Sequence, residues 1–190
     1  HTGMMAKGFE RVFGRTGARE AARAALRADE HAFAGYARWE INDRWTCTVP
    51  AEGLAFWQRE ARSFGRLESL RLPEPFAASA AFRRYLAERD VFVRQAAQGV
   101  FRLRRQLTKK ASVTYSLTLL RAQATGFAQA LRAGRKAARR MWVRTRDPRV
   151  HGPNEAMLTA DEARLREWRQ WLTACRRRPE LALDATPVCG

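Results

Sequence analysis

Side chains that perform acid–base, nucleophilic or metal chemistry are scarce in this sequence. It contains three cysteines and three histidines among 190 residues. Cys47, Cys175 and Cys189 are far apart and form no C-x-x-C pair, which predicts neither a disulfide framework nor a structural zinc site. Glycine-rich phosphate-binding loops, H-E-x-x-H and G-x-S-x-G are also missing. We therefore expect no catalytic residue, no cofactor and no metal.

Two histidines, His31 and His151, are considered as possible catalytic or metal-binding residues. His31 has no second ligand three or four residues away, which favours a surface histidine. His151, in a predicted loop beside Arg149, is the best candidate for a general base and leaves a nuclease as an alternative. No carboxylate cluster that could hold Mg²⁺ accompanies His151, so the sequence favours a binding protein over a nuclease.

Long uncharged apolar runs are also absent. No stretch of about 18 apolar residues occurs, so we expect no transmembrane helix. Residues 1–3 are interpreted as the remnant of an affinity tag before Met4 and Met5, and the residues that follow lack the apolar core of a signal peptide. These features predict a cytoplasmic protein.

Carboxylates are missing from one long segment. Between Asp90 and Asp147, 56 consecutive positions contain no Asp or Glu, and 14 of them are Lys or Arg. An ordinary solvated helix face would alternate Glu with Arg four residues apart. The formal net charge of the chain is +17, so the sequence predicts a polyanionic partner whose contacts concentrate on this segment.

Lysine is rare among the basic residues. The chain has four lysines and 32 arginines. The planar guanidinium group suits bidentate contacts with phosphate and stacking on bases, which favours nucleic acid as the polyanion. A GC-rich genome would also enrich arginine codons, so this preference discriminates only weakly.

The apolar pattern predicts an all-α fold. Helices are expected over about 16–41 and 50–65, within an N-terminal helical part that covers residues 4–72. Pro73 and Pro75 mark a connector to a second part, residues 76–178.

The second part has the clearest periodicity. Apolar residues recur at alternating spacings of four and three from Phe82 to Leu107, interrupted by Arg89, and again from Val113 to Met141. This predicts a helical bundle built around a long αα-hairpin, about 80–108 and 112–146, with flanking N- and C-terminal helices. The β-branched residues 113–118 could form a strand in place of the first helical turn.

Turn-forming residues follow the hairpin. Residues 145–158 are expected to form a loop, and Thr159 with Glu162 is typical of a capping box that begins a helix from about 160 to 178. Residues 179–190, after Pro179, are expected to form a tail.

A helical wheel places part of the basic set on one flank of the second hairpin helix, where it would form a stripe. The hairpin turn and the following loop would extend this stripe. Trp142 and His151 could stack on bases of a single strand, but for Trp142 a role in the core or as a lid is favoured, because large aromatic side chains are usually well buried. The residues expected to contact nucleic acid are Arg102, Arg105, Lys109, Lys110, Arg121, Arg132, Arg135, Lys136, Arg139, Arg140, Arg144, Arg146 and Arg149.

The sequence thus favours a non-enzymatic nucleic-acid-binding protein that contacts the phosphate backbone of DNA or RNA through an arginine-rich helical surface. The alternative is a helical adaptor that binds an acidic protein partner. In size, helicity and charge, the chain is similar to the small helical subunits that line nucleic-acid channels in multi-protein prokaryotic effector complexes. This similarity implies a role as a small subunit of a larger nucleoprotein complex.

Overall fold

The computed structural model describes residues 7–8, 10–11, 52–69, 76–145, 148–184 and 186–187. Within these ranges the chain is helical and contains no strand, which confirms the all-α prediction for this part of the protein. The helix expected over about 16–41 lies outside the described residues. The elements, in chain order, are α3 (Glu52–Ser69), α4 (Phe76–Thr108), α5 (Thr114–Thr145), α6 (Pro148–Arg177) and the 3₁₀ helix η1 (Pro179–Leu183).

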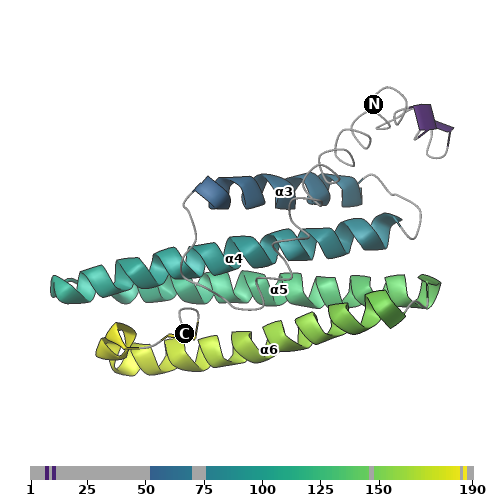
Figure 1. Ribbon diagram of the computed structural model, residues 1–190. Coiled ribbons are helices and arrows are strands. Elements are labelled where there is room, and N and C mark those ends of the chain that lie inside the picture. The colour runs from purple at the N-terminus through teal and green to yellow at the C-terminus, as the bar shows by residue number, and fades with distance from the viewer. Residues whose placement is uncertain are drawn as a thin grey trace.

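Helices α4 and α5 lie side by side along most of their length, with α3 on one side of them and α6 on the other (Figure 1). The turn that joins α4 to α5 ends α4 in a Schellman motif, because Ala111 N donates to Gln106 O and Lys110 N donates to Leu107 O, both at 2.9 Å. Lys110 has a φ of 53°, so a lysine occupies the left-handed position that usually favours glycine.

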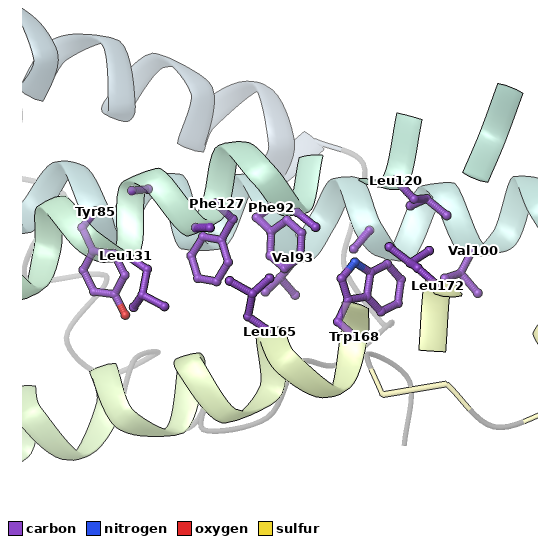
Figure 2. Packing of buried hydrophobic residues seen from close by; sticks show 14 of the residues in the cluster. Tyr85, Phe92, Val93, Val100, Leu120, Phe127, Leu131, Leu165, Trp168 and Leu172 are labelled. Atoms are coloured by element: carbon purple, nitrogen blue, oxygen red, sulfur yellow. The ribbon is translucent and has the colours of Figure 1, made fainter. Parts of the chain in front are cut away.

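The main core lies between α4, α5 and α6. Figure 2 shows side chains from all three helices converging there, including Phe92 from α4, Phe127 from α5 and Trp168 from α6. The Phe92 and Phe127 rings stack with centroids 4.6 Å apart, and Trp168 meets Phe92 edge-on at 6.4 Å. This aromatic contact fills the space between the three helices with large side chains.

Two glycines let α4 and α5 approach each other closely. A Cβ atom at Gly99 would collide with the side chain of Leu120, and one at Gly134 would collide with the ring of Tyr85. Because each glycine lacks a side chain, it leaves room for a large side chain of the facing helix.

Arg89, the charged interruption of the apolar pattern, has a structural explanation. Its Nε atom donates to Asp161 Oδ2 at 2.6 Å, and the Tyr85 hydroxyl donates to the same oxygen at 2.7 Å. Arg89 and Asp161 are both buried, so α4 and α6 are joined by an ion pair inside the bundle.

The prediction of a loop over residues 145–158 is wrong for most of that range, because α6 begins at Pro148. Proline suits the first helical position, where its missing N–H would have no partner in any case. Leu158 is fully buried in the core, and this burial outweighs the low helix propensity of Gly152 and Pro153. Glu162, expected to cap a helix, instead lies inside α6 and forms an ion pair with Arg135.

The segment after Pro179 is also not a free tail where the structure describes it. Ala182 is fully buried, and Arg104 of α4 donates from Nε to Ala182 O at 2.7 Å and from its Nη2 atom to Asp184 O. This docking could not be predicted, because an arginine side chain bonded to backbone carbonyls leaves no pattern in the residues that supply those carbonyls.

Helix α3 packs on α4 through a second, smaller apolar cluster. Phe64 and Leu67 of α3 meet Ala80 and Ala87 of α4. Arg84 extends this contact at the surface, where it forms ion pairs with Glu68 of α3 and Glu88 of α4. The residues on both sides of the Pro73 and Pro75 connector are therefore packed together.

Candidate functional site

One exposed face of α5 carries basic side chains along its length. Arg121, Arg132 and Arg139 lie within about 20° of one another around the helix axis, at 100° per residue, and Lys136 lies about 60° away. All four are exposed, and none forms an ion pair within the described part of the chain. From Arg121 to Arg139 the stripe spans about 27 Å, at 1.5 Å per residue.

Beside this stripe, α5 and α6 form the two walls of an open groove of about 740 Å³. Its apolar floor includes Ala128 and Leu131 of α5 and Leu165 of α6. Five arginines and one glutamate line it, so its charge is strongly positive. The charged lining residues are Arg132, Arg135, Glu162, Arg166, Arg169 and Arg177.

Three of these arginines, Arg166, Arg169 and Arg177, were not among the residues predicted from the sequence. They lie on α6, where Glu162 and Glu167 interrupt the basic run, so a search for segments without carboxylates passes over them. The spacing from position 162 to 166, 169, 173 and 177 places them on one helix face, and this periodicity is the signal that could have found them.

Arg135 is the member of the predicted stripe that the protein partly neutralises. Its Nη2 atom lies 2.8 Å from Glu162 Oε2, and its Nη1 atom lies 3.6 Å from Glu155 Oε2. Both carboxylates come from α6, outside the acid-free segment. The tertiary structure therefore supplies counter-charge to Arg135 that the linear sequence did not predict.

Arg169 reaches across the groove towards α5. Its Nη2 atom lies 3.5 Å from the backbone oxygen of Ala124, at the long limit of a hydrogen bond. The guanidinium group therefore extends over the groove floor, where most of its five N–H donors remain available for another acceptor.

A second group of predicted residues lies around the turn from α4 into α5. Arg102 and Arg105 are exposed on the last turns of α4, and Lys109 and Lys110 are exposed on the turn itself. None of these four forms an ion pair within the described residues. Arg104, between them in the sequence, is held by the carbonyl groups of the η1 segment.

The other residues predicted to contact nucleic acid lie towards the end of α5 and the start of α6. Arg140 is exposed and has an interaction partner. The side chains of Arg144, Arg146, Arg149 and His151 lie outside the described part of the structure. Trp142 is partly buried and makes contacts within the protein, so it is not a free platform for a base.

The described residues offer little for acid–base or metal chemistry. They contain no group of three or more His, Cys, Asp or Glu side chains placed to hold a metal ion. Cys175 is fully buried, and burial raises the pKa of its thiol to about 11, which keeps it protonated and unreactive near neutral pH. Cys47, Cys189 and His31 lie outside the described part.

The described part of the protein is thus a helical bundle with an arginine-lined groove between α5 and α6. Comparison of the chain with known protein families, with curated proteins and with solved structures finds no match. Among the helices that the structure describes, none is both long and apolar enough to cross a membrane.

Proposed function

We propose that this protein is a non-enzymatic nucleic-acid-binding protein that holds the phosphate backbone in the α5–α6 groove and along the adjoining basic face of α5. The observation that carries the proposal is the lining of the groove, which contains five arginines and one glutamate. Guanidinium groups bind phosphate oxygens through paired N–H donors, and each neutralised phosphate releases condensed counterions.

The groove supports recognition of backbone rather than of sequence. Its floor is aliphatic and its polar lining is mostly arginine, with Gln170 and Thr173 as the uncharged polar members. Phosphate contacts fix position and orientation but carry no direct sequence information. Binding is therefore expected to be strongly salt-dependent and to depend little on base sequence. This behaviour suits a small subunit of a larger nucleoprotein complex.

The experiment compares two charge-reversed variants. Arg132→Glu with Arg166→Glu alters both walls of the groove, and Arg59→Glu with Arg62→Glu makes the same change in net charge at exposed positions of α3. Gel shift or fluorescence anisotropy with single- and double-stranded oligonucleotides across a salt series measures the affinity. The groove variant is expected to lose binding, and the α3 variant is expected to retain most of it.

Two results would overturn the proposal. Absence of oligonucleotide binding by the unaltered protein at physiological salt would reject the function. An equal loss of affinity in both variants would show that overall charge, and not the groove, determines binding. Circular dichroism of each variant checks that the helical fold is retained.

The second candidate function is a helical adaptor for an acidic protein. The pairing of Arg135 with Glu155 and Glu162 favours it, because it shows that carboxylates on a helix can occupy this basic edge. An adaptor would bind no oligonucleotide at physiological salt and would co-purify with one specific acidic protein. The same anisotropy series therefore separates the two functions.

A further inference from the structure

Two aromatic rings near the turn between α4 and α5 are unusually exposed. Phe101 of α4 and Tyr115 of α5 each expose 71% of their surface. Large aromatic side chains are normally well buried, as Phe92, Phe127 and Trp168 are in this protein. Neither Phe101 nor Tyr115 belongs to the apolar core, so packing does not explain their presence.

The structure fixes where these rings stand relative to the cations of the turn. Ser116 Oγ donates to Gln106 Oε1 at 2.7 Å, which sets the register of the two helices. Because the helices run antiparallel, Tyr115 lies level with Leu107, about 3 Å along the axis from Arg105 and about 9 Å from Phe101. Phe101 is four residues before Arg105 and therefore lies on the same face of α4.

The surroundings of the rings are positively charged. Arg102, Arg105, Lys109 and Lys110 are all exposed there, and no position from 91 to 146 carries a carboxylate. Lys110 occupies the left-handed position of the turn, at φ 53°, although glycine would fit it with less strain. The Schellman hydrogen bonds hold this turn, so the cations project from a defined scaffold.

We propose that this end of the α4–α5 hairpin binds unpaired nucleotides, with Phe101 and Tyr115 stacking on bases and the four cations contacting the adjoining phosphates. Stacking on aromatic rings combined with cationic contacts to the backbone is the way in which proteins hold single-stranded nucleic acid. The inference rests on the proposed function and deepens it, since it names single strands as the preferred ligand.

Duplex nucleic acid fits these side chains less well. Bases inside a duplex are already stacked on their neighbours and cannot reach an exposed ring without being extruded at a cost. An anionic membrane surface also fits less well, because interfacial helices present a broad apolar face. Here the neighbours of Phe101 on α4 include Gln98 and Arg102, which are both exposed and polar.

The test replaces both rings without changing charge. Phe101→Leu with Tyr115→Leu keeps two apolar, helix-compatible side chains and removes the π-faces. Affinity is measured by anisotropy for single-stranded oligothymidine, single-stranded oligouridine and a duplex of equal length, across a salt series. Tyr115→Phe retains the ring, and Val143→Ala truncates another exposed apolar side chain of α5, away from the turn.

The double leucine variant is expected to bind single strands about 25-fold or more weakly, since each of the two stacked rings contributes a factor of about five or more. Its affinity for the duplex is expected to change by less than about twofold, and the slope of log affinity against log salt is expected to stay constant, because no phosphate contact is lost. The two control variants are expected to behave like the unaltered protein.

Each other outcome contradicts the inference in a recognisable way. Unchanged single-strand binding by the double variant, while the unaltered protein binds, rejects the stacking role and leaves the groove proposal standing. Equal losses for single strands and duplex reject the preference for unpaired nucleotides. Co-sedimentation with phosphatidylserine vesicles is measured alongside, and loss of vesicle binding by the double variant without loss of single-strand binding would assign these rings to a membrane surface. Absence of any nucleic-acid binding by the unaltered protein rejects this inference together with the proposed function.

Discussion

Arg89 of α4 and Asp161 of α6 form a buried ion pair, with Arg89 Nε 2.6 Å from Asp161 Oδ2. The Tyr85 hydroxyl donates to the same carboxylate oxygen, so one aspartate receives two donors from α4. Burial works against the charged form of Arg89, but Asp161, with smaller contributions from Tyr85 and Asp90, more than offsets this effect, so the pKa of the guanidinium group is raised. The guanidinium group therefore stays charged within the bundle, and its contact with Asp161 links α4 to α6.

The first prediction concerns this pair. Asp161→Asn removes the carboxylate that the buried Arg89 guanidinium group contacts, and it is expected to lower the free energy of unfolding by about 3–5 kcal/mol. Arg89→Met combined with Asp161→Leu removes both charges and is expected to cost much less. Tyr85→Phe, which loses one hydrogen bond, is expected to cost about 1 kcal/mol. Urea denaturation measures all three, and a double variant as unstable as Asp161→Asn would contradict this account.

The second prediction concerns glycines on the bundle helices. Gly134→Ala is expected to destabilise the protein by about 1–3 kcal/mol, because the added methyl group would collide with Tyr85, which Asp161 holds in place. Gly126 on the same helix has nothing within 4 Å of the position that a methyl side chain would take, so Gly126→Ala is expected to stabilise α5 by about 0.5–1 kcal/mol. Thermal unfolding followed by circular dichroism distinguishes the opposite signs.

The third prediction concerns the single acidic side chain of the groove. Glu162→Gln removes a negative charge from the lining and weakens the hold on Arg135, so affinity for an oligonucleotide is expected to rise about two- to fivefold at low salt. Glu167→Gln is the matched control, because Glu167 is an exposed residue of α6 that does not line the groove. Anisotropy titrations measure both, and an equal rise in both variants would point to net charge alone.

The fourth prediction concerns Asp90, whose pKa burial raises to about 6 although Arg89 and Arg94 oppose the shift. A folded-state pKa above the ordinary value of 3.8 means that the native protein binds a proton more tightly than the unfolded chain. This carboxyl group therefore contributes most favourably below about pH 4, and the contribution is lost as the pH rises through 6.

The Asp90→Asn variant isolates this effect. Asparagine cannot ionise, so the variant is expected to be more stable than the unaltered protein at pH 7, by about 1–3 kcal/mol. The difference is expected to shrink as the pH falls from 6 to 4. Urea denaturation of both proteins across this range measures it, and a difference independent of pH would show that ionisation of Asp90 is not its cause.

The sequence predicted the helical fold, and it predicted that cations of the α5 region are exposed, for physical reasons that act locally. Apolar spacings of four and three place side chains on one face of a helix whatever the partner is, so the seams of the α4 and α5 regions could be recognised directly. The segment from 91 to 146 supplies no carboxylate that could neutralise its own cations, and Arg132 and Arg139 are exposed and form no ion pair with another described residue.

Contacts between distant segments were decided by the tertiary structure. Arg89 interrupts an apolar seam, and only the approach of Asp161, 72 positions later, makes its burial favourable. The start of α6 at Pro148 and the docking of the η1 segment depend on burying Leu158 and Ala182, which outweighs local turn propensity. The groove exists only because α6 lies beside α5. This packing places Arg166 and Arg132 in the lining of one groove and brings Glu162 into contact with Arg135. The order of charges along the chain could not predict these contacts, because it does not determine which charges meet in space.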